Sequence, residues 1–261
     1  MEKNAIKNIV ILGTGNVAYH LSRAFHLAGY NIRQIYGRDP GKAGALARTV
    51  SSDPVSDLHQ MYMDADAYFF CVTDAGLADL TGKTWLGEKM AVHVSGSMDM
   101  QIMSRVSENY GVFYPLQTLS ENTPVDFSTV PVFLEANNKN NARRLTQLAR
   151  GLTSLVFEAG SEQRLIMHIS AVFACNFTNY LYGIAETLME SHNMDFQHLM
   201  PLIMETAGKA REISPKKAQT GPAKRKDMHI IDKHLERLDA YPEYKRIYEM
   251  LSGQIQDLYD V

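Results

Sequence analysis

"NIVILGTGNVAYHLSRAFHLAG", residues 8–29, is the stretch that decides the fold. Its apolar start is typical of a buried strand, and after Gly15 apolar residues recur at helical spacing. Gly13, Gly15 and Ala18 form a GxGxxA pattern between strand and helix. In such a turn the first glycine permits a tight bend, the second lets the backbone approach a pyrophosphate, and the helix N-terminus offers N–H donors. An ordinary glycine-rich turn is the alternative. We predict a dinucleotide-binding turn at Gly13, Thr14, Gly15, Asn16 and Val17.

The end of the second predicted strand decides which dinucleotide is expected. Folds of this kind usually carry an acidic residue about 20 residues after the glycines, where it holds a ribose. Here Tyr36, Gly37 and Arg38 fill that place, and Asp39 precedes Pro40, where it can cap the next helix. A guanidinium suits a phosphate, whereas a carboxylate suits a ribose diol. The sequence therefore predicts NADP(H) rather than NAD(H), with a solvated Arg38 as the alternative.

The chain separates into two parts at residue 160. Strand and helix patterns alternate up to that point, which predicts an α/β fold of Rossmann type with a mostly parallel sheet. The predicted strands are 8–13, 30–37, 67–73, 90–96, 130–136 and 154–160, with helices over 16–29, 40–50 and 139–151. Further helices are predicted over 161–191, 196–212, 228–239 and 243–259. We expect a nucleotide-binding domain at 1–160 and an all-helical domain at 161–261.

Composition argues against several classes of protein. Of the 261 residues, 45% are hydrophobic and 21% charged, and the net charge is −3, so no general attraction to nucleic acid or acidic lipid is expected. No apolar run approaches the roughly 18 residues of a membrane span or the length of a signal peptide, and the cytoplasm is the expected location. Cys71 and Cys175 lie in apolar runs and are predicted to be buried, reduced thiols. We predict no metal, because no zinc-type spacing, P-loop or HExxH motif occurs.

Six motifs carry a resemblance to a known family: ILGTGNVAYHL, YGRDP, FFCVTD, HVSGS, YPLQTLS and TGPAKRKD. Together they resemble the Rossmann-like family with a helical DUF2520 C-terminal domain, which is similar to pyrroline-5-carboxylate reductase, prephenate dehydrogenase and 6-phosphogluconate dehydrogenase-type enzymes. The resemblance covers essentially the whole chain. It implies an NADP-dependent oxidoreductase whose helical domain completes the active site and mediates dimerisation, and it implies no particular substrate.

The chain departs from the family pattern at two positions. Tyr114 stands before the PLQ motif, where the family often has a histidine, and this argues against proton transfer at that position. Lys226 stands between Arg225 and Asp227, where the family often has a glycine, so the conformation of that loop is left open.

Polar residues gather where the predicted strands end, the edge at which α/β sheets bind ligands. Val72 and Thr73 are predicted to contact the cofactor, and helix capping by Asp74 is the alternative role of that segment. Gln117 and Thr118 of the YPLQTLS motif suit hydrogen bonding to a polar substrate, or else only satisfy the backbone of their own loop.

The strand that ends near residue 94 carries further candidates. Ser95, beside Gly96 and Ser97, is predicted to reach the cofactor and the reacting group. His93 alternates with valines, so it can equally be a core histidine that pairs with backbone.

The predicted helix 161–191 carries two candidate catalytic residues. His168 is a candidate general acid or base, because an imidazole titrates near neutral pH. Asn176 lies in an apolar stripe, where a buried amide needs a polar partner or a ligand. The stripe comprises Ile169, Phe173, Asn176, Tyr180, Ile184 and Leu188. Val172 stands where some hydroxyacid dehydrogenases carry a lysine, so their mechanism is not transferred. Residues 165–188 are apolar on nearly all sides, which favours burial between domains or subunits and a homodimer.

Residues 209–226 hold seven Lys and Arg side chains. A solvated basic loop is the ordinary interpretation, but Thr220-Gly221-Pro222 predicts a fixed turn that delivers Arg225 and Asp227 to a site. Arg225 would suit an anionic group of a substrate, such as a carboxylate.

The sequence as a whole predicts an NADP-dependent oxidoreductase that moves a hydride between nicotinamide and a small carbonyl, alcohol or imine. The alternatives are a specific prephenate-dehydrogenase-like or pyrroline-5-carboxylate-reductase-like enzyme, and a non-catalytic NADP-binding sensor. No nucleic acid or membrane partner is expected.

Overall fold

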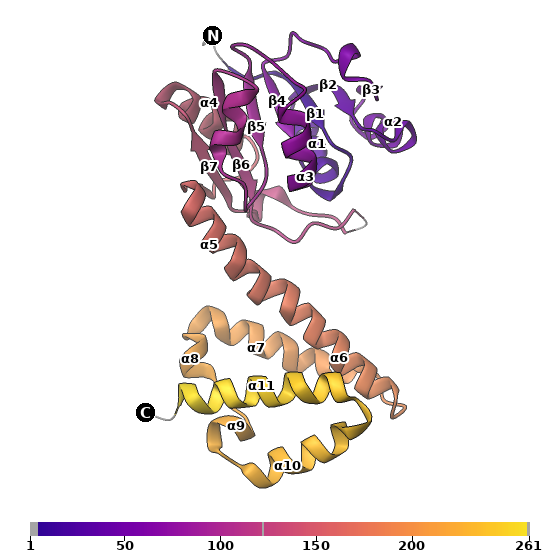
Figure 1. Ribbon diagram of the computed structural model, residues 1–261, viewed down its shortest axis with the longest axis vertical. Coiled ribbons are helices and arrows are strands. Elements are labelled where there is room, and N and C mark those ends of the chain that lie inside the picture. The colour runs from indigo at the N-terminus through magenta and orange to yellow at the C-terminus, as the bar shows by residue number, and fades with distance from the viewer. Residues whose placement is uncertain (1–4, 122, 260–261) are drawn as a thin grey trace. The chain divides into compact units, whose positions relative to one another are not determined.

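The computed structural model describes residues 5–121 and 123–259. The chain divides into two compact units, Met1–Asn176 and Phe177–Val261, which are drawn in Figure 1. Within the described residues the first unit holds all of the strands, and the second is formed of helices.

The first unit is built on an eight-stranded sheet. The strands are β1 (Asn8–Leu12), β2 (Asn31–Tyr36), β3 (Asp53–Val55), β4 (Ala67–Phe70), β5 (Met90–His93), β6 (Asn109–Pro115), β7 (Val132–Ala136) and β8 (Val156–Glu158). They lie in the order β3-β2-β1-β4-β5-β6-β7-β8. All neighbours pair in parallel except β6 and β7, which are antiparallel. The predicted Rossmann-type, mostly parallel sheet is confirmed.

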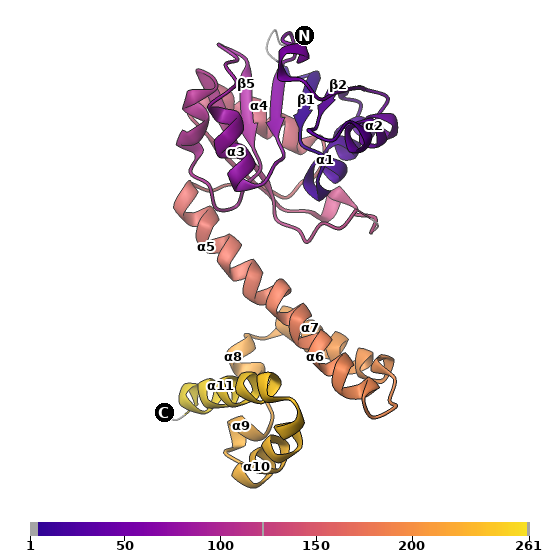
Figure 2. The same ribbon diagram turned by 45° about the vertical axis from the view of Figure 1, so that its right-hand side comes forward.

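Helices surround this sheet (Figure 2). They are α1 (Asn16–Leu27), α2 (Pro40–Thr49), α3 (Asp74–Thr81) and α4 (Lys139–Arg150), with short 3₁₀ turns η1 (Leu58–Gln60), η2 (Met100–Arg105) and η3 (Phe127–Thr129). Ile9 and Ile11 pack in one apolar cluster with residues of α1 and α4, whereas Val10 and Leu12 pack in another with residues of α3. Strand β1 is thus buried on both faces, which explains its unbroken apolar run.

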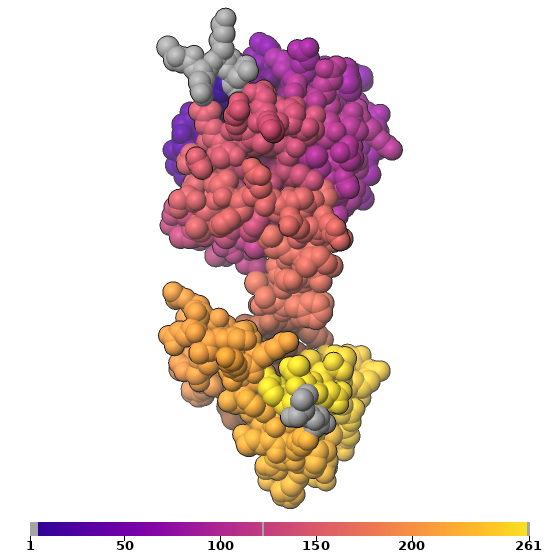
Figure 3. Space-filling view, turned by 90° about the vertical axis from the view of Figure 1, so that its left-hand side faces the viewer, coloured from indigo at the N-terminus to yellow at the C-terminus, as the bar shows by residue number. Residues whose placement is uncertain are grey.

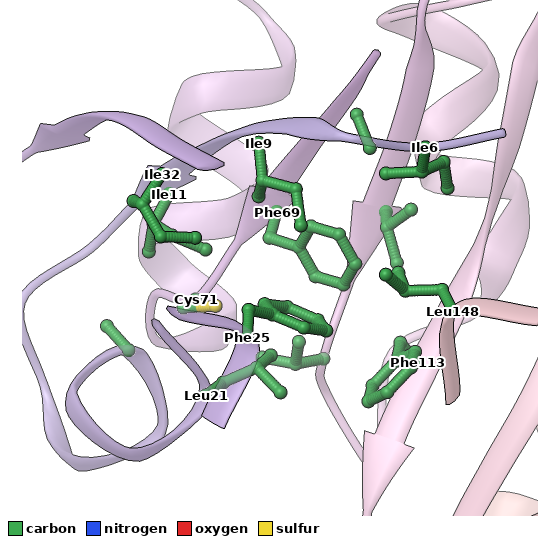
Figure 4. Close-up of a cluster of buried hydrophobic side chains, with 14 of the residues drawn as sticks. Ile6, Ile9, Ile11, Leu21, Phe25, Ile32, Phe69, Cys71, Phe113 and Leu148 are labelled. Carbon is green, nitrogen blue, oxygen red and sulfur yellow. The ribbon is translucent and has the colours of Figure 1, made fainter. Parts of the chain in front are cut away.

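Three phenylalanines fasten α1 to the sheet (Figure 4). The ring of Phe25 on α1 lies edge-to-face with Phe69 of β4 at 5.0 Å and with Phe113 of β6 at 5.8 Å between centroids. All three side chains are fully buried. This packing holds the N-terminus of α1 at the carboxyl ends of the parallel strands, where ligands bind in such sheets.

Two strands, β3 and β6, escape the sequence analysis. The segment of β6 contains Gly111 and ends on Pro115, and both residue types are depleted in strands. The tertiary fold requires Gly111, because a Cβ there would lie 2.5 Å from the carbonyl oxygen of Glu135 on the neighbouring strand. As a consequence, Tyr114 belongs to the end of a central strand.

The second unit contains α6 (Thr178–Glu190), α7 (Met200–Glu212), α8 (Pro215–Ala218), α9 (Pro222–Arg225), α10 (Met228–Arg237) and α11 (Pro242–Leu258), with 3₁₀ turns η5 (Phe196–Leu199) and η6 (Leu238–Ala240). Figure 3 draws this unit in space-filling form, with α11 in yellow at its surface. Among its described residues only Ala223, Ile231 and Leu238 are buried hydrophobic side chains. The unit therefore buries very little apolar surface within the chain.

The predicted helix 161–191 is interrupted. It consists of α5 (Ser161–Ala171), a π-helix η4 (Val172–Phe177) and α6. A π-helix inserts an extra residue into the turn, so the apolar stripe that the sequence suggests does not continue at α-helical spacing. The boundary between the compact units falls at the end of this π-helix, whereas residue 160 marks the end of the sheet region.

One burial expectation for this segment is wrong, and the burial of residues 165–188 between domains or subunits stays a prediction. Cys175 is exposed, although Cys71 is buried as predicted. Asn176 is exposed as well. Their neighbours Phe173 and Phe177 are 65% and 50% exposed, so the helix around them is uncovered within the chain and apolar sequence alone does not bury it.

Candidate functional site

The glycine turn after β1 has the geometry of an anion cradle. Gly13 has a φ of +131°, and a Cβ there would lie 2.0 Å from the carbonyl oxygen of Cys71, so a larger residue does not fit. Gly15 is the N-cap of α1 and makes no side-chain cap, and a Cβ on it would meet nothing within 4 Å. The first-turn N–H groups of α1 therefore lack a side-chain acceptor from their cap, and the space beside Gly15 is open. This donor set fits the pyrophosphate of a dinucleotide.

A cavity of about 510 Å³ lies beside the turn. Its lining residues from the turn are Gly13, Thr14 and Gly15, and those from the ends of β2 and β4 include Tyr36, Arg38, Val72 and Thr73. Lys83, a second cation that the sequence analysis does not single out, also lines it and forms an ion pair of 2.6 Å with Asp79. The structure thus brings Arg38 and the glycine turn to one cavity.

The side chain of Asp39 caps helix α2. Its Oδ1 accepts hydrogen bonds from the N–H groups of Gly41 at 2.9 Å and Lys42 at 3.2 Å, so it caps α2. The expected capping role is confirmed, and Arg38 is the charged side chain of this strand end that lines the cavity.

The loops after β4 and β5 are joined by hydrogen bonds. Thr73 caps α3 by accepting from the N–H of Gly76 at 3.2 Å. Asp74 instead accepts from the hydroxyls of Ser95 at 2.7 Å and Ser97 at 2.5 Å. The interpretation of Asp74 as the helix cap is therefore wrong, because its carboxylate turns toward the loop after β5.

A second cavity of about 400 Å³ lies next to the first. Both are lined by Gly15, Cys71, Val72 and Thr73. Residues from five segments far apart in the sequence line the second cavity, among them Asn16, Val17, Asp74, Ser95, Gly96, Ser97, Tyr114, Gln117 and His168. The structure therefore gathers His168, Ser95 and Gln117, which the sequence analysis considers separately.

His168 packs against two residues at the wall of this cavity. Its Nδ1 lies 3.1 Å from the Oη of Tyr114, and the two rings meet edge-to-face. A Cβ on Gly96 would lie 2.8 Å from both Cγ and Nδ1 of His168, so the glycine makes room for the ring. Burial raises the pKa of the Tyr114 phenol above its usual value, and the nearby Arg164 opposes that change. Tyr114 lines this cavity, although its departure from the family's histidine argued against proton transfer at that position.

His93 is a core histidine, the second of the two interpretations considered for it. Its side chain is fully buried, and its Nδ1 accepts a hydrogen bond from the N–H of Ser95 at 3.1 Å. Burial lowers the pKa of His93 to about 3, with the positive charge of Arg164 acting in the same direction. Its Nε2 has no hydrogen-bond partner within residues 5–121 and 123–259. A neutral His93 shapes the turn that carries Ser95.

Arg164 on α5 is a buried cation that the sequence analysis did not identify. It pairs with Glu135 of β7 at 2.5 Å and donates to the carbonyl oxygens of Ser95 at 3.1 Å and Met98 at 2.6 Å. One side chain thus joins α5 to β7 and to the loop after β5. The sequence carries no signal for this burial, because Leu165, Ile166 and Ile169 on the other face of α5 are the residues that an amphipathic pattern would bury, and they are exposed.

The loop after β6 is fastened to α1. Asn16 donates through its Nδ2 to the carbonyl oxygen of Leu119 at 2.9 Å, and the Nε2 of His20 lies 2.8 Å from that of Ser120. The side-chain oxygen of Gln117 accepts a hydrogen bond from the N–H of Thr118 at 2.8 Å, so this oxygen is bonded within its own loop. Asn16 therefore links the nucleotide turn to the loop that carries Gln117 and Thr118.

The second unit holds the remaining candidate. Arg225 is exposed at the end of α9, and Asp227 caps α10 by accepting from the N–H of Ile230 at 3.4 Å. Lys226 adopts the left-handed conformation, with φ of 55° and ψ of 37°. The loop thus keeps a glycine-like backbone at Lys226, and one carboxylate oxygen of Asp227 caps α10, while the delivery of Arg225 and Asp227 to a site stays a prediction.

No group of three or more His, Cys, Asp or Glu among the described residues is placed to hold a metal ion. No helix that the structure describes is both long and apolar enough to cross a membrane.

Two protein families match the chain. Residues 8–95 match the family described as "NADP oxidoreductase coenzyme F420-dependent", and residues 130–255 match "Domain of unknown function (DUF2520)". No curated protein matches the chain.

Solved structures resemble the whole chain. A "putative NADP oxidoreductase" from Bacteroides fragilis is 39% identical, with a TM-score of 0.91 over 97% of this chain and 98% of that one. A pyrroline-5-carboxylate reductase from Coxiella burnetii is 17% identical, with a TM-score of 0.54 over 97% and 98% of the two chains. An imine reductase from Myxococcus stipitatus in complex with NADP+ is 12% identical, with a TM-score of 0.62 over 96% and 92%. The last two show a shared fold.

Proposed function

The chain belongs to the family of the B. fragilis protein, with the DUF2520 domain in its C-terminal half, and on that premise we propose that it transfers a hydride between NADP(H) and a small carbonyl, alcohol or imine. The observation that carries the proposal is the pair of adjoining cavities. One adjoins the glycine turn and Arg38, and the next is lined by His168, Ser95 and Gln117. A bound nicotinamide would supply or accept the hydride.

The glycine turn and Arg38 hold the cofactor in this proposal. Gly13, Thr14, Gly15, Asn16 and Val17 surround the pyrophosphate, and Val72, Thr73 and Ser95 line the path from the first cavity to the second. Arg38 meets the 2′-phosphate that distinguishes NADP from NAD, because a guanidinium binds phosphate through two parallel hydrogen bonds.

The second cavity holds the substrate. His168 donates or accepts a proton at the substrate heteroatom, with Ser95 beside it, and Gln117 binds a polar group of the substrate. Thr118, which does not line this cavity, stays a prediction as a substrate contact. Asn176 and Arg225 stay predictions as a catalytic residue and as the contact to an anionic group. Residues 161–261 would form the domain that completes the site.

The cofactor part is tested by thermal stability with NADPH and NADH. A ligand at 100 times its Kd stabilises the folded protein by about 2.7 kcal/mol, so NADPH should raise the Tm more than NADH at equal concentration. Arg38→Gln should weaken NADPH binding tenfold or more, since a charge-assisted hydrogen bond contributes about 1.5–3 kcal/mol. NADH binding should stay unchanged. Lys42→Gln is the matched control, because Lys42 lies on α2 and its side chain is exposed. Equal losses for both cofactors would contradict the role of Arg38.

A turnover assay distinguishes the proposed oxidoreductase from a non-catalytic NADP-binding sensor. Oxidation of NADPH is followed by absorbance with small oxo acids, ketones and imines, and reduction of NADP+ with alcohols. If NADPH binds but none of these compounds reacts, the non-catalytic sensor becomes the better interpretation.

We also propose that the protein is a homodimer. The second unit leaves large apolar side chains exposed, including Leu202 at 64%, Met204 at 65% and Met250 at 59%. A unit of this size needs a core of its own, and such exposed patches mark association sites. Light scattering should give about twice the chain mass of 29.3 kDa. A monomeric mass at micromolar concentration would overturn this part.

A further inference from the structure

The phenol of Tyr114 has a single hydrogen-bond partner in the part of the chain that the structure describes. Its side chain is 8% exposed, and its Oη lies 3.1 Å from the Nδ1 of His168. Such a contact has two possible directions, because a phenol and an imidazole nitrogen can each donate or accept. The direction decides which nitrogen of the neutral ring carries its proton.

The surroundings of the phenol settle the direction. Burial raises the pKa of Tyr114, so the phenol keeps its proton at neutral pH. A buried O–H needs an acceptor, and within residues 5–121 and 123–259 the one in reach is the Nδ1 of His168. If Nδ1 carried the proton instead, the phenol O–H would have no acceptor among the described residues. Tyr114 therefore donates, and neutral His168 carries its proton on Nε2.

The Nε2 edge is the free edge of the ring. Gly96 packs against Cγ and Nδ1, and Tyr114 occupies Nδ1, whereas Nε2 has no hydrogen-bond partner among the described residues. The ring also lines the cavity of about 400 Å³. We propose that Tyr114 fixes His168 as a hydrogen-bond donor toward that cavity, so that the site receives a ligand group with a lone pair, such as a carbonyl oxygen.

This inference rests on the proposed function and narrows its substrate class. A ketone or aldehyde oxygen accepts the Nε2–H hydrogen bond, which polarises the carbonyl group. A protonated iminium nitrogen has no lone pair, so it could not accept a hydrogen bond from the Nε2–H of His168. The carboxylate of Asp74, which could favour a cation, accepts from the hydroxyls of Ser95 and Ser97. Tyr114 acts through His168 and is thus a positioning residue.

The tautomer is measured by ¹⁵N NMR of the imidazole side chains in the full-length protein with NADP+ at about pH 8.5, where histidines are ordinarily neutral. Assignment uses the His168→Gln spectrum. We expect the resonances of His168 to show a protonated Nε2 and a bare Nδ1. In Tyr114→Phe the Nδ1 resonance should move and the two tautomers should mix. Tyr110→Phe is the matched control on the same strand, because Tyr110 bonds Gln101 instead, and it should leave His168 unchanged. A protonated Nδ1 in the unaltered protein, or no response to Tyr114→Phe, would overturn the inference.

The ligand class is measured on the same sample with two probes of similar size. Cyclohexanone presents a lone pair, whereas piperidinium is a cation without one. We expect cyclohexanone alone to shift the Nε2 resonance, and less so in Tyr114→Phe. An equal response to piperidinium, or no response to cyclohexanone, overturns the ligand class. Neither measurement needs turnover, so the tautomer can be correct while the enzymatic proposal fails.

Discussion

Arg164 and Glu135 form an ion pair of 2.5 Å in which the side chains are 1% and 18% exposed. The same guanidinium donates to the carbonyl oxygens of Ser95 and Met98. His168 lies one helical turn further along α5. The pair therefore fixes the distance between the helix that carries His168 and the loop that carries Gly96, which is where the His168 ring is seated.

Arg164→Met should destabilise the protein by about 3–5 kcal/mol, because removal of one partner leaves the Glu135 carboxylate without its counter-ion, with the Ser161 hydroxyl as its remaining side-chain donor, and leaves two carbonyl oxygens without Arg164. Urea denaturation followed by circular dichroism measures the change. Arg105→Met is the control, since Arg105 is exposed on η2, and it should cost less than about 0.5 kcal/mol. A similar small loss for Arg164→Met would show that the clamp does not support the fold.

Gly96→Ala should displace His168. The new methyl group would lie 2.8 Å from two atoms of the imidazole ring, and crowding of this kind costs about 1–3 kcal/mol. The His168 resonances should shift in the same experiment that reports its tautomer. Gly44→Ala on α2 is the control, because its nearest neighbour is the flexible end of Arg48 at 3.6 Å, and it should leave His168 unchanged. Unshifted His168 resonances in Gly96→Ala would refute the packing.

Lys226→Gly should be more stable than Lys226→Ala by about 1 kcal/mol. Lys226 has a φ of 55°, a conformation that costs a residue with a Cβ about 1–2 kcal/mol and costs glycine nothing. Both variants remove the side chain, so their difference isolates the backbone. Thermal denaturation of the two proteins measures it, and equal Tm values would contradict a left-handed residue at this position.

Because His93 is buried in its neutral form, the free energy of unfolding should decrease as the pH falls. Burial lowers the pKa of His93 to about 3, so between pH 6.5 and that value the unfolded chain binds a proton that the folded protein does not. The free energy of unfolding should therefore fall by about 2 kcal/mol between pH 7 and pH 5 from this residue alone. In His93→Gln that part of the pH dependence should vanish, whereas His59→Gln, which alters an exposed histidine, should keep it. Identical pH profiles for the unaltered protein and His93→Gln would contradict a neutral, buried imidazole.

The sequence by itself determined the features that depend on local chemistry. The GxGxxA turn, the strand and helix alternation and the capping by Asp39 each follow from residue types within a few positions of one another. For this reason the sheet and most helices were predictable, and so was the arrangement of Arg38 beside the glycine turn.

The remaining features depend on contacts between segments that are distant in the sequence and come together only in the folded chain. Strand β6 exists because Gly111 fits against β7, and Tyr114 meets His168 across 54 positions of sequence. Arg164 is buried because β7 supplies a carboxylate for it. In the same way, Asn176 and Cys175 are exposed because the π-helix that carries them is uncovered within the chain, which no local sequence pattern predicts. The apolar residues of the sequence are candidates for burial. Which of them are buried depends on how the folded chain packs.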